Sequence, residues 1–254
     1  MKTRDNTILI TGGGSGIGRG LAEAFHALGN QVIIAGRRKQ ALEETTKAHP
    51  GMASYGVDLQ DPSATRAFAA QIARDFPALN VLINNAGIMR AESLQSQPEE
   101  LADMEAIVAT NLLAPIRLTA ALLPQLRQQP RSTIINVSSG LAFIPLAQTP
   151  TYCATKAALH SYTQSLRYQL KGTTTEVLEL IPPYVATDLM NGAADSRAMP
   201  LGTFITEVMH ILKTLPHATE ICVENVKRLR FAAQTGKDEE IFQGFNDAMA
   251  KQPH

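Results

Sequence analysis

The sequence predicts an α/β protein with a doubly wound parallel sheet in a single domain over residues 1–254. Short apolar runs rich in β-branched residues alternate with longer segments of helical periodicity. The chain of 254 residues contains no Pro- or Ser-rich linker and no repeat that would divide it. Strands that alternate with helices form parallel sheets, whose ligands bind at the carboxyl edge. The strands are expected near Thr7, Gln31, Ala53, Val81, Thr133 and Val177, and the helices near Gly16, Gln40, Ser63, Glu99 and Tyr152.

The first predicted strand, 7–10, leads into a glycine-rich turn and then an amphipathic helix. The turn, from Thr11 to Gly18, reads Thr-Gly-Gly-Gly-Ser-Gly-Ile-Gly. Glycines let a backbone approach a pyrophosphate, and the first amides of a helix favour an anion. This pattern predicts dinucleotide binding by Gly12, Gly14, Ser15, Gly16, Ile17 and Gly18. The alternative is a glycine-rich turn without a ligand.

Two arginines follow the second predicted strand, 31–36, where binding of NAD would require a carboxylate for the ribose 2′-hydroxyl. Arg37 and Arg38 are instead suited to a 2′-phosphate, which guanidinium groups grip with paired, charge-assisted hydrogen bonds. The sequence therefore predicts NADP in preference to NAD. The alternative is that both arginines only begin a solvated helix.

Tyr152 and Lys156 are four residues apart, so on a helix they lie one above the other. We expect the ammonium to lower the pKa of the phenol, which is about 10 in a free tyrosine. Tyr152 would then move the proton of an alcohol while a hydride moves to or from a nicotinamide. Ser139, thirteen residues earlier, is the expected hydrogen-bond donor to the substrate oxygen. Side-chain alternation along the preceding strand favours it over Ser138.

Further motifs are Val-Asp-Leu around Asp58 and Asn-Asn-Ala-Gly from Asn84 to Gly87. In this order the motifs resemble those of the short-chain dehydrogenase/reductase family, which has a compact Rossmann-like fold. The stretches 139–143 and 152–160 most resemble the DltE-type oxidoreductases within it. The resemblance covers about 7–188 and implies a catalytic tetrad of Asn111, Ser139, Tyr152 and Lys156. It also implies cofactor contacts from Asp58, Asn85, Ala86, Gly87, Tyr152, Lys156, Val185 and Thr187.

The resemblance assigns a task to each member of the tetrad. Tyr152 is the general acid or base, and Ser139 holds the substrate oxygen. Lys156 lowers the pKa of Tyr152 and bonds the nicotinamide ribose, while Asn111 supports a water that passes protons towards solvent. The sequence departs from the family at Pro183, where a glycine is usual, so that a backbone amide donor is lost. The family habit of pairing through central helices implies a homo-oligomer, with a dimer favoured.

The predicted function is NADP-dependent hydride transfer between nicotinamide and a carbonyl or secondary alcohol. A catalytically silent NAD(P)-binding sensor is the alternative, although a sensor does not need the tetrad. A sugar-nucleotide epimerase is a third reading, which calls for an additional substrate domain. Segment 188–203 is expected to be a lid over the substrate, and 224–254 a helical tail that buries a seam against the domain or a second subunit. The expected apolar pocket residues are Met89, Leu141, Phe143, Tyr184 and Met190, and the expected seam residues are Val226, Leu229, Ile241, Phe242 and Phe245.

Charge and composition argue against several other classes. The 23 basic and 23 acidic residues balance, so neither a nucleic acid nor a membrane is a predicted partner. The first apolar run is too short for a signal peptide, and we expect a cytoplasmic protein. The two cysteines and six histidines show no metal-ligand spacing, so no metal is expected. His160, two turns after Tyr152, is expected in packing or a partner contact.

Overall fold

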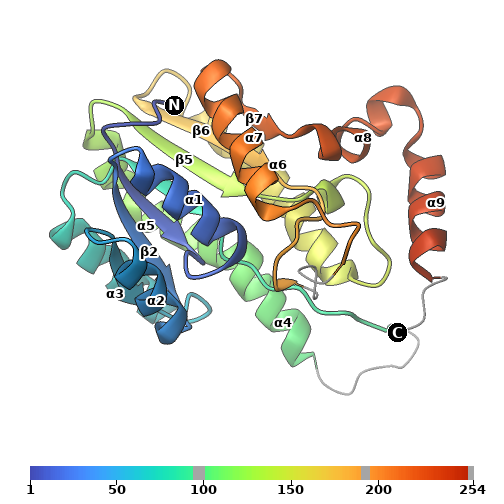
Figure 1. Cartoon of the computed structure of the whole chain (residues 1–254), viewed down its shortest axis with the longest axis horizontal. Coiled ribbons are helices and arrows are strands. Elements are labelled where there is room, and N and C mark those ends of the chain that lie inside the picture. Colours follow the sequence, from blue (N-terminus) through green and yellow to red (C-terminus); the bar gives the residue numbers. More distant parts are fainter. Residues whose placement is uncertain (94–100, 190–194, 251–254) are drawn as a thin grey trace.

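The computed structural model describes residues 1–93, 101–189 and 195–250. It contains a seven-stranded parallel sheet of order β3-β2-β1-β4-β5-β6-β7 (Figure 1). This confirms the predicted doubly wound α/β fold. The strands are β1 (Thr7–Thr11), β2 (Gln31–Gly36), β3 (Ala53–Gly56), β4 (Val81–Asn84), β5 (Ser132–Val137), β6 (Thr175–Ile181) and β7 (Glu220–Cys222).

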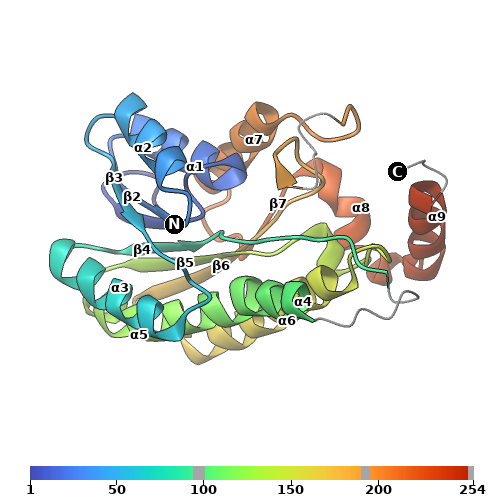
Figure 2. The ribbon, with the colours of Figure 1, turned by 90° about the horizontal axis from the view of Figure 1, so that it is seen from below.

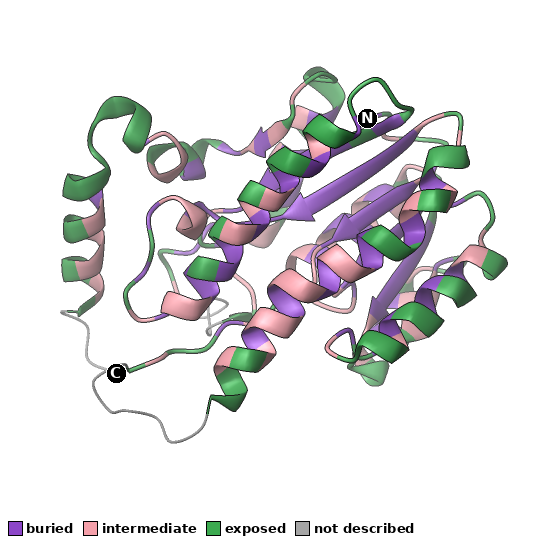
Figure 3. Ribbon diagram, turned by 180° about the vertical axis from the view of Figure 1, so that it is seen from behind, coloured by how far each residue is buried: buried purple, intermediate pink, exposed green. Residues whose placement is uncertain are grey.

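Helices cover both faces of the sheet (Figure 2). One face carries α1 (Gly16–Ala27), α2 (Lys39–Ala48) and α7 (Leu201–Thr214). The other carries α3 (Pro62–Asp75), α4 (Ala102–Val108), α5 (Ala114–Gln128) and α6 (Pro150–Gln169). Because the sheet is covered on both sides, β4 and β5 are buried along their whole length (Figure 3).

Each face has its own hydrophobic core. Phe25 of α1 and Phe204 of α7 are fully buried on one face, together with Ile8 and Ile10 of β1. Leu9 points the other way, into the core formed with α3, α5 and α6, as the two-residue period of a strand requires. The start of α3 is fixed locally, because the Asp61 carboxylate accepts hydrogen bonds from the first free amides of that helix.

The boundary of the expected lid differs from the expectation. Helix α7 begins at Leu201, after Pro200, so the last residues of the expected lid 188–203 belong to its first turn. Phe204, Ile205, Val208 and Leu212 of α7 face the core, which explains why the helix starts there. Residues 190–194 of the expected lid lie outside the described residues.

The central helix, Ala102–Gln128, is long and apolar enough to cross a membrane by length and composition. About 44% of its most apolar window is buried. It comprises α4, a π-helical turn at Ala109–Leu113 and α5, and it packs against α3 and α6. A core helix passes the same test, so this single helix is weak evidence for a membrane. The π turn carries Asn111, and such turns are frequent at functional sites.

The C-terminal tail packs against its own domain. It contains short 3-10 turns, α8 (Lys227–Arg230) and α9 (Asp238–Ala250), which stands at the end of the molecule beyond α8 (Figure 1). Ile241, Phe242 and Phe245 of α9 pack with Leu229 and Ile144. Val226 joins the core beside α1 and α7. The predicted seam is therefore present, and it is formed with the domain itself.

Candidate active site

The glycine turn after β1 is shaped by close backbone packing. Gly12 and Gly16 have φ values of 68° and 52°, a region that favours glycine. A Cβ atom at Gly18 would lie 2.4 Å from the Gly12 carbonyl oxygen. Glycine at 18 is thus required by the fold itself, whatever the turn binds. The turn leads directly into α1, with Ser15 just before its first residue.

The same turn is tied to the end of β4. The Thr11 hydroxyl accepts hydrogen bonds from the amides of Asn85 and Ala86, each at 3.0 Å. The Asn85 side chain donates back to the Thr11 carbonyl at 2.9 Å. The carboxyl ends of two neighbouring strands are therefore fixed to one another, which places Gly87 beside the glycine turn.

Two arginines and an aspartate lie at the carboxyl ends of β2 and β3, and all three are exposed. Arg38 donates a short hydrogen bond to the hydroxyl of Ser15 in the glycine turn. The Asp58 carboxylate accepts from the amide of Gln60 at 3.0 Å. Arg37 and Arg38 thus stand next to the turn that is predicted to bind a pyrophosphate.

The four residues of the predicted tetrad come together at the same edge of the sheet. Ser139, after β5, hydrogen-bonds to Tyr152 of α6. The Lys156 ammonium lies 5.5 Å from the centre of the Tyr152 ring. A Cβ atom at Gly87 would lie 3.5 Å from Oδ1 of Asn111 and 3.6 Å from Nζ of Lys156. Four segments far apart in the sequence therefore meet around Gly87.

Asn111 has a fixed orientation. Its Oδ1 accepts from the Ile88 amide at 2.9 Å, and its Nδ2 donates to the Ile88 carbonyl at the same distance. Nδ2 also lies 3.3 Å from the Thr155 hydroxyl on α6. The Asn111 side chain thus joins the central helix to α6 and to the segment that follows β4.

The electrostatics differ from the expectation in one respect. Burial raises the pKa of Tyr152 to about 12, although its hydrogen bond with Ser139 works in the opposite direction. Burial lowers the pKa of Lys156 to about 8, while the charge of Glu179 opposes that shift. The expected net lowering of the Tyr152 pKa is not observed, because burial outweighs the opposing contributions. Nζ of Lys156 donates to the Val137 carbonyl at 2.8 Å. At neutral pH the phenol keeps its proton.

Comparison with known proteins agrees with this arrangement. The family model described as short chain dehydrogenase matches residues 6–198. The chain belongs to the short-chain dehydrogenase family. It is 40% identical to an uncharacterized oxidoreductase DltE of Bacillus subtilis, over 97% of this chain and 98% of that protein. It is therefore an oxidoreductase that depends on a nicotinamide cofactor.

Solved structures of other short-chain dehydrogenases share the fold. A closed form of serine dehydrogenase complexed with NADP⁺ has a TM-score of 0.75 and 25% identity, covering 84% of this chain and 91% of that one. A short-chain dehydrogenase from Burkholderia phymatum in complex with NAD has a TM-score of 0.80 and 19% identity, covering 94% and 97%. Both nicotinamide dinucleotides thus occur among proteins of this shape.

In this short-chain dehydrogenase the segment after β6 returns to the glycine turn. A Cβ atom at Gly16 would lie 3.3 Å from Cγ2 of Thr187. Val185 is buried and pairs with Met199 in a short parallel bridge. The carbonyl of Pro182 accepts from the Gly140 amide at 2.9 Å, which joins this segment to the one that carries Ser139. Thr187 therefore lies beside the glycine turn, and its segment is joined to the one that carries Ser139.

The residues present fit a nicotinamide dinucleotide. Positions 36 and 56, at the ends of β2 and β3, have open space, since an added Cβ at Gly36 meets only Leu42, at 3.9 Å, and one at Gly56 meets nothing within 4 Å. The exposed Arg38 and Asp58 border this space, and Lys156 and Asn111 border the other end of the crevice. An adenosine half would be held near the arginines and a nicotinamide half near Lys156.

Two of the five residues expected to line an apolar pocket lie beside Tyr152: Met89 and Leu141 pack with it. Phe143 instead lies between His160 and Arg230. Its ring centre is 4.8 Å from that of His160, in an edge-to-face contact, and 4.5 Å from the guanidinium carbon of Arg230. Tyr184 is 43% exposed and donates to the Asp195 carboxylate, so it lies outside this cluster. Met190 lies outside the described residues.

Two residues that the sequence did not place near Tyr152 pack beside it. Phe245 and Met249 of α9 join the cluster around Tyr152 and Met89. The side chain of Asn246, between them, accepts from the Ala147 amide at 2.7 Å and donates to the Pro145 carbonyl at 3.1 Å, so it fixes α9 to the loop before α6. The four-residue spacing of Phe245 and Met249 marks an apolar helix face, but it does not say what that face contacts.

Proposed function

We propose that this protein is an NADP-dependent oxidoreductase that transfers a hydride between nicotinamide and a carbonyl or secondary alcohol, with Tyr152 as the acid or base. The observation that carries the proposal is the buried Tyr152 phenol, which lies beside Ser139 and has the Lys156 ammonium 5.5 Å from its ring centre. A buried general acid next to a second hydroxyl suits a substrate oxygen that must gain a proton. We place the enzyme in the cytoplasm.

In the direction of reduction, Ser139 and Tyr152 hold the substrate carbonyl oxygen between their hydroxyls. The nicotinamide, when bound, supplies the hydride for the carbonyl carbon. Tyr152 gives its phenolic proton to the oxygen, so that the products are an alcohol and a phenolate. The Lys156 charge, 5.5 Å from the ring centre, stabilises that phenolate. Asn111, whose side chain is fixed by the Ile88 backbone, would support a water through which a proton from solvent returns by way of Lys156 to the phenolate. Oxidation of an alcohol reverses these transfers.

The preference for NADP is supported by Arg37 and Arg38. Both are exposed at the end of β2, and Arg38 touches Ser15 of the glycine turn. A 2′-phosphate there would receive charge-assisted hydrogen bonds that the ribose 2′-hydroxyl of NAD cannot match. The test is a fluorescence titration with NADPH and NADH, and tighter binding of NADH would overturn the preference.

The residues around Tyr152 favour a largely apolar substrate. Met89, Leu141, Phe245 and Met249 form its apolar surroundings. Basic side chains lie next to these residues: Arg90 donates to the Met89 carbonyl at 3.0 Å, and Nη1 of Arg197, which pairs with Asp195, lies 3.6 Å from Sδ of Met249. The apolar side chains themselves suit a simple aldehyde, ketone or secondary alcohol.

We also propose that the enzyme is a homodimer. The helix Ala102–Gln128 has a mean hydropathy of 1.7 in its most apolar window, yet only 44% of that window is buried within one chain. An apolar helix face of this kind is stabilised by a second copy. Light scattering of the purified protein should give twice the mass of 27.4 kDa, and a monomer at micromolar concentration would contradict the dimer.

The decisive experiment for the activity is a screen of aldehydes, ketones and secondary alcohols at the absorbance band of reduced nicotinamide. Turnover that depends on Tyr152 would support the enzyme. Tight NADPH binding without turnover of any substrate would instead favour the cofactor-binding sensor.

A further inference from the structure

A buried carboxylate lies behind the candidate active site. Glu179 of β6 is fully buried, in a strand that is paired on both sides by β5 and β7. A carboxylate so far from water is costly unless its oxygens are bonded and a positive charge is near. The groups that bond to Glu179, and the positive charges near it, therefore indicate its role in the site.

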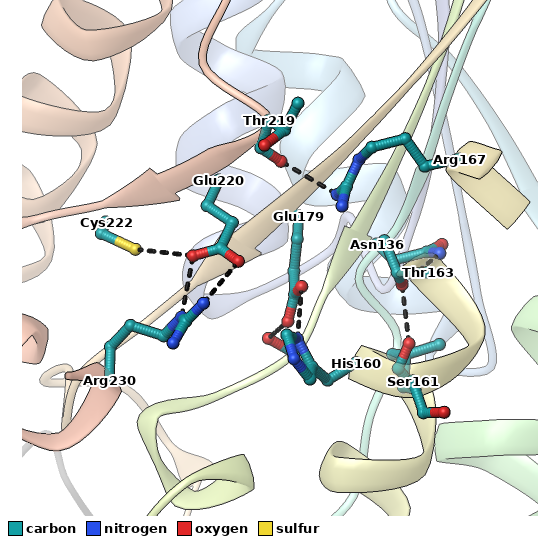
Figure 4. Close-up of polar contacts among 12 residues, drawn as sticks. Asn136, His160, Ser161, Thr163, Arg167, Glu179, Thr219, Glu220, Cys222 and Arg230 are labelled. Carbon is teal, nitrogen blue, oxygen red and sulfur yellow. Dashed lines mark hydrogen bonds and ion pairs between the residues drawn. The ribbon is translucent and has the colours of Figure 1, made fainter. Parts of the chain in front are cut away.

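Both oxygens of Glu179 have partners on the elements that carry the tetrad. Oε1 accepts from the hydroxyl of Ser138, the residue before Ser139, at 2.5 Å. Oε2 lies 2.7 Å from Nδ1 of His160, one helical turn after Lys156 on α6 (Figure 4). Glu179 thus holds the end of β5 and the middle of α6 in a fixed relation.

The Lys156 ammonium makes no ion pair with this carboxylate among the described residues, but it lies on α6 one turn before His160, which contacts Glu179 directly. The bond of the ammonium to the Val137 carbonyl places it at the end of β5, where Asn136 pairs with Glu179 and Val137 with Leu180. Burial lowers the pKa of Lys156 to about 8, and the charge of Glu179 acts against that shift. Lysine would otherwise lose its proton more readily in such a site.

Two arginines near Glu179 make their hydrogen bonds with other groups, although the charge of Glu179 also acts to raise the pKa of each. Arg230 of α8 donates hydrogen bonds to both carboxylate oxygens of Glu220, each at 2.8 Å. Arg230 and Glu220 therefore form an ion pair of their own beside Glu179 (Figure 4). Arg167 donates to the carbonyls of Val177 and Thr219. The titratable and charged groups that face Glu179 are Lys156, His160 and Arg167 from α6, Glu220 and Cys222 from β7, and Arg230 from α8.

We propose that Glu179 is a positioning residue of the active site, whose buried negative charge keeps the Lys156 ammonium protonated beside Tyr152. The proposal rests on the proposed function, because it assigns Lys156 its catalytic task. Glu179 touches neither substrate nor cofactor. It acts through Lys156, and through Ser138 it fixes the strand end that carries Ser139.

The test compares Glu179→Gln with Glu220→Gln. Glutamine keeps the size of glutamate and one acceptor oxygen, but it replaces the other oxygen by an NH2 donor and removes the charge. The charge of Glu220 is already paired with Arg230. In Glu179→Gln, the alkaline limb of the kcat/KM profile should move to lower pH by about one unit. In Glu220→Gln the limb should stay where it is in the unaltered enzyme. An unmoved limb in Glu179→Gln, or an equal shift in both variants, would overturn the proposal.

A second readout does not depend on turnover. Carbon-13 signals of lysine side chains in the cofactor-free protein, with Lys156 assigned by Lys156→Met, should show Lys156 titrating at lower pH in Glu179→Gln than in the unaltered protein. If Glu179→Gln does not fold, the carboxyl carbon of Glu179 in the unaltered protein should change its shift over the range in which Lys156 titrates. A Glu179 carboxyl signal that does not change over this pH range would refute the electrostatic coupling between Glu179 and Lys156. Should Tyr152→Phe keep full turnover while these signals behave as expected, the proposed function fails and the coupling stands.

Discussion

Replacement of Tyr152 by phenylalanine tests the central step directly. The substitution removes only the hydroxyl, and the ring, 6% exposed, keeps its contacts with Met89 and Leu141. Burial raises the Tyr152 pKa to about 12 from about 10, a difference of about 3 kcal/mol against the phenolate. The phenol is therefore protonated over the whole neutral range, and its proton is the one that a carbonyl reduction uses.

We expect kcat for reduction to fall by about 10²- to 10⁴-fold in Tyr152→Phe, the usual contribution of a general acid. The affinity for NADPH should change little, since no other binding group is altered. The loss of one hydrogen bond with Ser139 costs about 1 kcal/mol, so the melting temperature should fall by only a few degrees. Steady-state rates, fluorescence titration of NADPH and thermal melting provide the three measurements.

Tyr162→Phe is the matched control, because it removes a hydroxyl from the same helix. Tyr162 packs against the core between the sheet and α3, α5 and α6, away from the cluster around Tyr152. Its turnover should equal that of the unaltered enzyme. A Tyr152→Phe variant that retains more than a tenth of the activity, or loses it together with NADPH binding, would refute the assignment of the general acid.

Four further predictions follow from particular contacts. Arg38→Ala should weaken NADPH binding by about tenfold or more and leave NADH binding unchanged in a titration, and equal effects on both would contradict the 2′-phosphate site. Gly18→Ala should cost about 1–3 kcal/mol in thermal unfolding, since its Cβ would lie 2.4 Å from backbone oxygen, whereas Gly244→Ala in α9 meets nothing and should be neutral or stabilising. Phe245→Ala should raise KM for bulky apolar substrates more than for small ones, and a uniform change would argue against its place in the pocket. Between pH 8 and about 10, Lys156 binds more protons in the unfolded chain than in the folded one, so the free energy of unfolding rises with pH. The full rise is worth about 3 kcal/mol. The Lys156→Met variant should lose this pH dependence in thermal melts across that range.

The sequence allowed the sheet and the edge of the site to be predicted well. Strands at Thr7, Gln31, Ala53 and Val81 begin where expected, because short β-branched runs between turn residues have few other stable conformations. The glycine-rich pattern also predicted correctly that a strand precedes the turn and a helix follows it. Spacing on one helix brought Tyr152 and Lys156 together, since residues four apart share a face.

The proton affinities at the site could not be predicted in this way. They depend on how deeply Tyr152 and Lys156 are buried, and part of that cover comes from Phe245 and Met249, about ninety residues further along the chain. Glu179 was missed for a related reason. A glutamate within a strand is usually taken as facing solvent, but a strand in the interior of a covered parallel sheet is buried on both faces.

The two pKa shifts place opposite demands on one site. Burial excludes water and keeps the proton on Tyr152, as a reduction requires, but the same burial drives Lys156 towards its neutral form. A positive charge brought in from solvent would not solve this, because it would further disfavour the ammonium. A buried carboxylate behind Lys156 meets both demands, because its negative charge favours the ammonium form of Lys156. The hydrogen bond from Ser138 and the contact with His160 hold the Glu179 carboxylate in place. The depth of the site and the acidic residue in β6 are therefore parts of one arrangement, and losing Glu179 should affect the enzyme most at alkaline pH.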